Sequence, residues 1–200
     1  GVANSFERIA LFREWHFGRY SSVRKPQATA GRTDRMEDDA SNLALLINQL
    51  EHTDVWPGFN DLLAQFLPRF ARLSTKLTAT GSIQLFLHEQ GLSSPVSATR
   101  LSDGTIRFIS LLALLFAPFP PPLLCIEEPE LGLHPDAVSL LAPVLVDASQ
   151  RMQLIVTTHS DALISALSEH VESVLVCEHR GETTFERLKT EKLQHWLQKY

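Results

Sequence analysis

The second half of the chain alternates short apolar runs with longer amphipathic segments. This pattern predicts strands over residues 122–127, 152–157 and 171–177, and helices over residues 104–116, 136–149 and 161–168. A further strand at 183–188 and a final helix at 190–198 close the chain. Apolar strands joined by helices are typical of a mainly parallel sheet that is flanked by helices. We therefore expect residues 101–200 to form an α/β lobe.

Residues 1–100 have a different pattern, in which helical periodicity gives way to strand-like alternation. We expect helices over residues 4–14, 42–50 and 60–66, with Ser41 as the cap of the second, and a short strand at 15–17. The polar residues 21–39 are predicted to be a loop, and residues 73–80 and 82–88 an antiparallel hairpin. This half is therefore predicted to be a small helical and antiparallel portion.

The composition narrows the class of protein. The chain is 44% hydrophobic and 20% charged, which is ordinary for a soluble globular protein. Cys125 and Cys177 lie in apolar runs, which predicts buried, reduced thiols and a cytoplasmic location. The apolar stretch 106–126 contains Arg107 and several prolines, so we expect no membrane span and no membrane partner.

Charge is distributed unevenly along the chain. The net charge is −5, which argues against a generally basic surface for nucleic acids. Residues 1–35, however, carry seven Lys or Arg and three acidic residues, a net charge of +4. This basic segment contacts phosphates, forms a solvated surface, or packs near a lobe that is absent from these residues. DNA therefore stays a candidate partner.

The stretch LLCIEEPELGLHP, residues 123–135, reads as an apolar strand that ends in acidic residues. At the end of such a strand, the neighbouring carboxylates of Glu127 and Glu128 can face one site. A pair of this kind suits a magnesium-nucleotide site, where one acid holds the cation and the other orients or deprotonates a water. A solvated acidic turn is the alternative that this stretch alone leaves open.

Two further motifs frame the acidic pair. LSDGTIRFI precedes it at residues 101–109, and LIVTTHSDAL follows at residues 154–163. This order resembles the signature motif, Walker B motif, D-loop and switch histidine of ABC-type ATPases. The residues of these motifs are most similar to those of the RecF-like predicted ATPases, the AAA-21 or AAA-ATP-like group. The resemblance extends from about Trp15 to Tyr200. The resemblance implies the C-terminal lobe of an ABC-ATPase head.

Ser102, Asp103 and Gly104 open a predicted helix, and a helix N-terminus favours a phosphate. Ser102 is a suitable N-cap. The resemblance implies that this signature motif contacts ATP held by a second subunit. Asp103 departs from the common LSGGQ sequence of this motif. Its carboxylate would repel a phosphate unless the side chain points away. Arg107, four residues later on the helix, can contact a phosphate or pair with Asp103, and we expect the ion pair.

For the acidic stretch, the resemblance implies that Glu127 is associated with Mg²⁺, in place of the usual aspartate, and that Glu128 is the catalytic glutamate. His159 matches the switch histidine beside the γ-phosphate. Leu131, Gly132 and His134 fall in the D-loop region of the nucleotide site. His134 has several open roles, namely metal ligand, subunit contact, or capping and packing of the next helix.

A P-loop of the form G-x-x-x-x-G-K-[ST] does not occur in these 200 residues. We therefore expect this chain to be part of an ATPase that uses ATP and Mg²⁺, and to be inactive by itself. The resemblance implies a second ATPase head as partner, in a homodimer or with a P-loop-bearing protein, and a role in DNA repair, DNA maintenance or defence. The alternatives are a non-catalytic interaction subunit and, less well supported, a metal-dependent nuclease built on Glu127, Glu128, His134 and His159.

Overall fold

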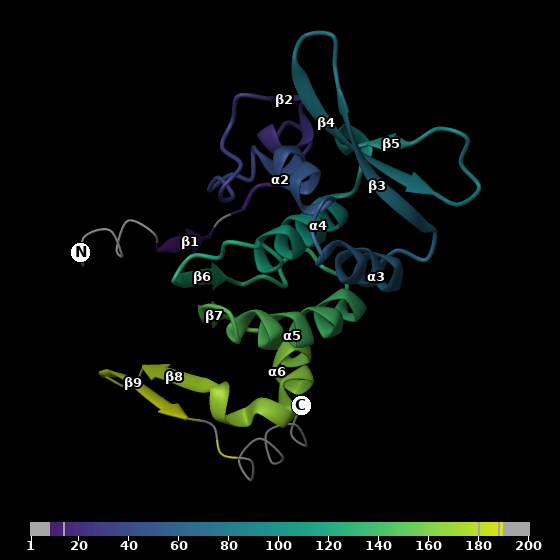
Figure 1. Ribbon diagram of the computed structural model, residues 1–200. Coiled ribbons are helices and arrows are strands. Elements are labelled where there is room, and N and C mark those ends of the chain that lie inside the picture. Colours follow the sequence, from purple (N-terminus) through teal and green to yellow (C-terminus); the bar gives the residue numbers. More distant parts are fainter. Residues whose placement is uncertain (1–8, 14, 180, 188, 190–200) are drawn as a thin grey trace.

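The computed structural model describes residues 9–13, 15–179, 181–187 and 189. At its centre is a parallel sheet with the strand order β1 (Ala10–Phe12), β6 (Leu123–Glu127) and β7 (Gln153–Thr157). Figure 1 shows these strands stacked beside the helices that follow β6 and β7. The fold is therefore α/β with a parallel sheet, which confirms the class predicted from the alternating pattern.

Helices α4 (Asp103–Leu115) and α5 (Pro135–Ser149) lie on one side of this sheet (Figure 1). Leu124 and Ile126 of β6 alternate with exposed or half-buried neighbours and belong to the same hydrophobic core as both helices. The short helix α6 (Asp161–Ala166) follows β7 and packs against α5. Because β6 and β7 are parallel, the loops that lead into α5 and α6 start at the same edge of the sheet.

The opposite face of the parallel sheet is open. Leu11, Cys125 and Ile155 are register partners on the three strands and so form one row on one face. Leu11 is 51% exposed, Ile155 is 50% exposed, and Cys125 is half-buried. Parallel sheets are normally covered on both faces. This row is therefore an apolar surface that the described residues leave uncovered.

An antiparallel sheet lies beyond α4, at the top of Figure 1. It has the order β2 (Gln27–Ala28), β4 (Ser82–Glu89) and β3 (Phe70–Leu77), and β5 (Val96–Ser97) also pairs with β4. Helices α2 (Leu43–Leu50) and α3 (Trp56–Phe66) pack between this sheet and the helices of the parallel sheet. Buried residues of both portions belong to one hydrophobic core. No helix of the described residues is long and apolar enough to cross a membrane.

The N-terminal half differs from the sequence prediction in several places. Residues 10–12 form β1 rather than part of a helix, and no strand occurs at 15–17. The predicted loop 21–39 contains the 3₁₀ turn η1 (Ser22–Arg24) and strand β2. Helix α3 begins at Trp56 instead of residue 60, because proline in a first helical turn loses no hydrogen bond. Ser41 does not cap α2, whose N-cap position is Asn42.

The C-terminal strands form a separate antiparallel pair. Residues 168–173 are the 3₁₀ segment η3 (Ser168–Ser173), and β8 (Leu175–His179) pairs with β9 (Thr183–Arg187) rather than with the parallel sheet. The predicted strand at 171–177 is therefore wrong in its start and in its partner. Cys177 on β8 is exposed, which contradicts the buried thiol predicted from its apolar run. The predicted helix at 190–198 lies outside the described residues.

Candidate functional site

The acidic pair lies where β6 ends. Glu127 is the last residue of the strand and pairs in register with Thr157 at the end of β7. Glu128 has a φ of 43°, and its amide donates a hydrogen bond of 2.9 Å to the Thr157 carbonyl. A positive φ is uncommon for a residue with a side chain, so the backbone turns sharply here. The turn places both carboxylates at the edge of the sheet where the β7 loop also begins.

His159 lies opposite Glu128 across this edge. Its Nε2 is 3.6 Å from Oε1 of Glu128, and its side chain is 91% exposed. Ser160 follows as the N-cap of α6 and accepts a hydrogen bond of 3.2 Å from the Leu163 amide. Ser160 therefore caps the helix that follows the loop of His159. The two parallel strands thus bring a glutamate and a histidine together from positions that are far apart in the sequence.

Glu130 joins the two loops, a role that the sequence reasoning missed. Its Oε1 accepts hydrogen bonds from the Thr158 hydroxyl and, at 3.2 Å, from the His159 amide. Its Oε2 is buried and has no hydrogen-bond partner in the structure. The only signal in the sequence was a third acid in EEPE, which also fits a solvated turn. Glu130 therefore holds the loop after β7 against the loop after β6.

A cavity of about 430 Å³ opens beside the acidic pair. Its lining includes Phe12, Trp15, His16, Arg107, Glu127 and Glu128. Arg107 donates a hydrogen bond of 3.0 Å to the Trp15 carbonyl and lies over the Phe17 ring, 5.2 Å from its centroid. Burial lowers the pKa of the Arg107 guanidinium, and the charge of Glu130 opposes this shift. The acidic pair thus faces a cavity that also has cationic and aromatic side chains.

The segment LSDGTIRFI, which resembles a signature motif, leads into helix α4. Ser102 is the N-cap, and its Oγ accepts a hydrogen bond of 3.1 Å from the Thr105 amide and lies 2.8 Å from Oγ1 of Thr105. The predicted cap is therefore confirmed. Asp103 pairs with Arg24 rather than with Arg107, so the predicted ion pair along the helix is wrong. Arg107 instead turns to Trp15, because packing against the β1 loop outweighs a weak surface pair on one helix.

The loop at residues 131–134, which resembles a D-loop, touches the start of α4. A Cβ atom at Gly104 would lie 2.9 Å from the Gly132 carbonyl oxygen, a distance too short for any side chain. Gly132 has a φ of 71°, which glycine adopts readily. Leu131 beside it is 52% exposed. The structure therefore brings residues 102–104 and residues 131–132 together at one surface of the protein.

His134 has the capping role in this structure, which is one of the roles that the sequence left open. It is the N-cap of α5, and its Nδ1 accepts a hydrogen bond of 3.3 Å from the Asp136 amide. Within the described residues, no group of three or more His, Cys, Asp or Glu side chains is arranged to hold a metal ion. Two adjacent carboxylates fit Mg²⁺ bound together with nucleotide phosphates, since Mg²⁺ keeps several waters and needs few protein ligands. They do not provide the larger acid cluster of a two-metal nuclease.

The contact between Gly104 and Gly132 makes a testable prediction. We expect Gly104→Ala to lower the free energy of unfolding by about 1–3 kcal/mol, because the methyl group must displace a backbone carbonyl. Gly58→Ala in α3 is the matched control, since its Cβ would meet Phe116 at an ordinary 3.7 Å and alanine favours a helix by about 0.5–1 kcal/mol. Urea denaturation measures both. Equal stability of the two variants would contradict the close approach.

Comparison with solved structures gives the class of the fold. The chain resembles one solved in work on ATP-driven dimerization and DNA-stimulated activation of SMC ATPases, with a TM-score of 0.57, 18% identity, and coverage of 78% of this chain and 96% of that chain. An Smc head bound to the C-winged helix domain of ScpA has a TM-score of 0.58 and 16% identity over 92% of this chain and 56% of the other. An Smc head domain from Pyrococcus yayanosii has a TM-score of 0.56 and 19% identity, covering 78% of this chain and 30% of that longer one. The fold is that of an ATPase head.

The family follows from the sequence itself. The family described as "AAA domain, putative AbiEii toxin, Type IV TA system" matches residues 10–165. This match spans more than half of the chain, so the protein belongs to that family of AAA-type ATPase domains. The resemblance to ABC-type, RecF-like ATPases is thereby confirmed. No curated protein matches the chain in sequence.

Proposed function

We propose that this chain is the signature-bearing part of an ATPase head that binds and hydrolyses ATP as an ATP-sandwiched dimer. The observation that carries the proposal is the pairing of Glu128 with His159, 3.6 Å apart, at the carboxyl ends of two adjacent parallel strands. In open α/β sheets, ligands bind outside the carboxyl ends of the strands. The family membership and the ATPase-head fold support the same conclusion.

The acidic edge of the sheet would carry out the chemistry. Glu127 would hold Mg²⁺, which neutralises the charge that develops on the phosphates. Glu128 would orient the attacking water and accept its proton. His159 would donate a hydrogen bond from its imidazole N–H to the γ-phosphate. Glu130 supports this arrangement because it binds the amide of His159 and the hydroxyl of Thr158.

The start of α4 would recognise ATP that is held by the other head. The Ser102 hydroxyl and the Gly104 amide lie at a helix N-terminus, which favours a phosphate. Leu131 and Gly132 form the adjoining surface, where Gly132 touches Gly104, and His134 starts the next helix. The signature and D-loop residues would therefore meet the second head together, in a homodimer or with a P-loop-bearing partner.

The open face of the parallel sheet supports the proposal that this chain holds only part of the nucleotide site. Leu11 and Ile155 are each about half exposed on a face that parallel sheets normally cover. A lobe with a P-loop would bury this apolar row and supply the phosphate-binding amides and lysine. The same surface is compatible with the second candidate, a subunit that donates its signature motif to a P-loop partner and does not hydrolyse ATP itself.

We expect the 200-residue chain alone to hydrolyse ATP at no more than the background rate, because it has no phosphate-binding loop. The full-length protein should show magnesium-dependent hydrolysis under the same conditions. Phosphate release measured for both, with and without DNA ends, tests the proposal. Turnover by the chain alone that Glu128→Gln abolishes would show that the site is already complete. Absence of turnover by the full-length protein would favour the non-catalytic subunit.

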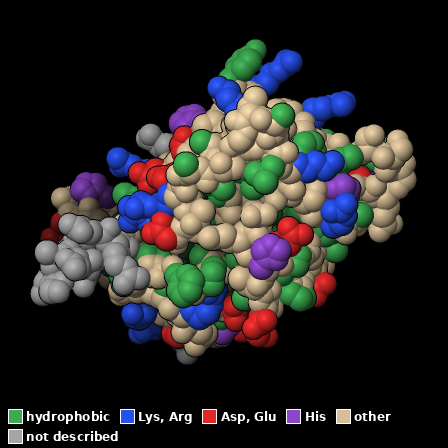
Figure 2. All heavy atoms as spheres, turned by 45° about the horizontal axis from the view of Figure 1, so that its top comes forward, with side chains coloured by type: hydrophobic (Ala, Val, Ile, Leu, Met, Phe, Trp, Pro, Cys, Tyr) green, Lys and Arg blue, Asp and Glu red, His purple; other side chains and the backbone are tan. Residues whose placement is uncertain are grey.

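For the process that ATP turnover drives, we propose DNA repair, DNA maintenance or defence in the cytoplasm. The family description refers to a putative AbiEii toxin of a type IV system, and one similar structure belongs to DNA-stimulated SMC ATPases. Figure 2 shows Lys and Arg side chains dispersed over one face rather than gathered in a single patch. Arg24 of the basic N-terminal segment is buried. DNA contact would therefore depend on the assembled dimer more than on this face.

A further inference from the structure

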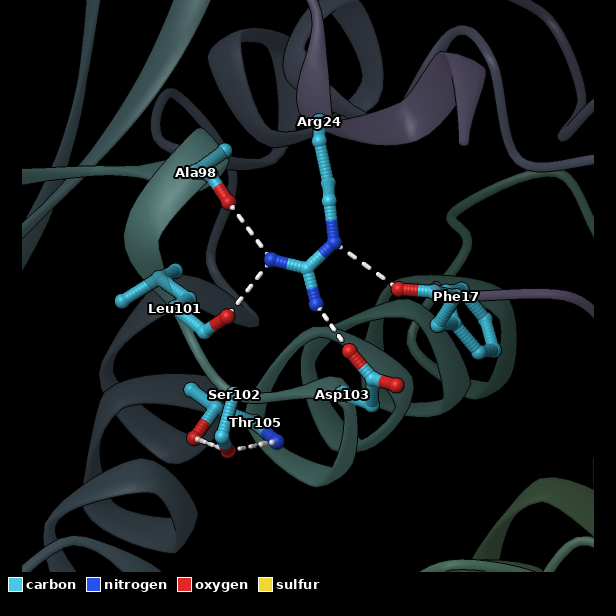
Figure 3. Close-up of polar contacts among 7 residues, drawn as sticks. All are labelled: Phe17, Arg24, Ala98, Leu101, Ser102, Asp103 and Thr105. Carbon is cyan, nitrogen blue, oxygen red and sulfur yellow. Dashed lines mark hydrogen bonds and ion pairs between the residues drawn. The ribbon is translucent and has the colours of Figure 1, made fainter. Parts of the chain in front are cut away.

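Arg24 is a buried cation in the segment before the antiparallel sheet. It ends η1 and is only 3% exposed. Figure 3 shows its guanidinium group at the centre of four partners that come from two distant parts of the chain. Nε donates to the Phe17 carbonyl at 2.8 Å, and Nη1 donates to the carbonyls of Ala98 at 3.1 Å and Leu101 at 2.5 Å. Nη2 forms an ion pair with Oδ1 of Asp103.

These contacts hold the main chain on both sides of Ser102. Leu101 is bound through its carbonyl and Asp103 through its carboxylate, so the residue between them has little freedom to move (Figure 3). The 3₁₀ turn η2 (Ala98–Arg100), just before the signature motif, packs against η1. A guanidinium group suits this arrangement because it is planar, always charged, and presents five donors in a rigid geometry.

The ion pair with Arg24 also compensates the negative charge of Asp103. The Asp103 side chain is 68% exposed, whereas the Arg24 side chain is 4% exposed, so the cation is the desolvated partner. A buried cation without its acceptors is strongly unfavourable. Arg24 therefore draws the carboxylate to itself and compensates the negative charge beside the helix N-terminus. That charge would otherwise repel an incoming phosphate.

We propose that Arg24 is a positioning residue for the signature motif, an inference that rests on the proposed recognition of ATP across a dimer. It holds the Ser102 hydroxyl and the Gly104 amide ready for the γ-phosphate of the opposite nucleotide, and it neutralises Asp103 at that surface. It does not touch the nucleotide bound by its own head. Loss of Arg24 should therefore impair the signature surface, while ATP binding at the P-loop expected in the same head of the full-length protein persists.

The test uses Arg24→Lys and Arg24→Met in the full-length protein. Lysine keeps the positive charge but not the planar set of donors of the guanidinium group. Methionine fills similar space without a charge, and buried ion pairs often tolerate replacement by apolar side chains. We expect hydrolysis to fall by about 10- to 100-fold, the range for one or two lost charge-assisted hydrogen bonds. Binding of a fluorescent ATP analogue to the monomer should stay unchanged. Arg32→Lys, in the exposed Arg32–Asp34 pair, is the control and should behave as wild type.

Complementation separates positioning from a folding defect. Mixing Arg24→Met with a variant that lacks the P-loop lysine should restore hydrolysis, because one composite site then has an intact P-loop and an intact signature motif. Thermal unfolding of each variant is measured beside it. Wild-type hydrolysis by both Arg24 variants, or folded variants that the mixture does not rescue, would overturn the inference. A wild-type protein that neither hydrolyses ATP nor dimerises with it would instead overturn the proposed function, and the inference with it.

Discussion

Glu128→Gln in the full-length protein should lower the rate of ATP hydrolysis by about 10²- to 10⁴-fold, the usual contribution of a general base. The amide keeps the shape of the side chain but cannot accept the proton of the attacking water. ATP binding should persist, because Glu127 and the phosphate-binding residues are unchanged. The variant should therefore accumulate as an ATP-bound dimer. Size-exclusion chromatography with light scattering, in the presence of ATP and Mg²⁺, measures this shift.

Glu172→Gln is the matched control for this substitution. Glu172 also lies beside a histidine, with 3.8 Å between its Oε1 and Nδ1 of His170, but it belongs to η3 and does not line the cavity beside the acidic pair. It should retain wild-type hydrolysis and should not accumulate a dimer. If Glu128→Gln remained monomeric with ATP and turned over normally, Glu128 would have no catalytic role.

Ser102→Arg should abolish ATP-driven dimer formation, because a long cationic side chain would fill the surface where the opposite γ-phosphate is expected. The monomer should lose only about 1 kcal/mol of stability, the usual value of an N-cap, since Ser102 caps α4 through the Thr105 amide. Ser102→Ala is the control, because it removes the same cap without adding bulk. It should have the same stability loss and a smaller loss of dimer.

Mixing Ser102→Arg with a variant that lacks the P-loop lysine extends this test. One chain then lacks a working signature motif and the other lacks the P-loop lysine. One of the two composite sites should therefore be complete, and hydrolysis should return. Phosphate release from the mixture is compared with that from each variant alone. A mixture that stays inactive while both chains are folded and pair with each other would show that this motif does not work across a dimer.

Local features of the chain could be predicted from the sequence without knowledge of the fold. The strands at 122–127 and 152–157 and the helices that follow them agree closely with β6, β7, α5 and α6. The cap at Ser102 could also be predicted, because a cap depends on residues within three positions of each other. Periodicity and capping act over one or two turns, so a window of the sequence contains all of their determinants.

Short strands and strands at the edge of a sheet were predicted less accurately from the sequence. β1 is three residues long and its neighbour Ile9 is exposed, so the apolar positions Ile9 and Ala10 imitated the periodicity of a helix. The predicted strand at 171–177 failed because β8 depends on its partner β9 and not on the parallel sheet. In both places the backbone conformation follows from pairing with another segment, which local propensity does not encode.

The sequence by itself determined the order of the motifs, the α/β class and the residue types at the acidic edge. Only the tertiary structure decided that Arg24 binds Asp103, 79 positions away, that Glu130 holds the His159 loop, and that Gly104 touches Gly132. It also decided that the row from Leu11 to Ile155 lies uncovered. These outcomes depend on which distant segments pack together, and a buried guanidinium group binds whichever acceptors that packing supplies.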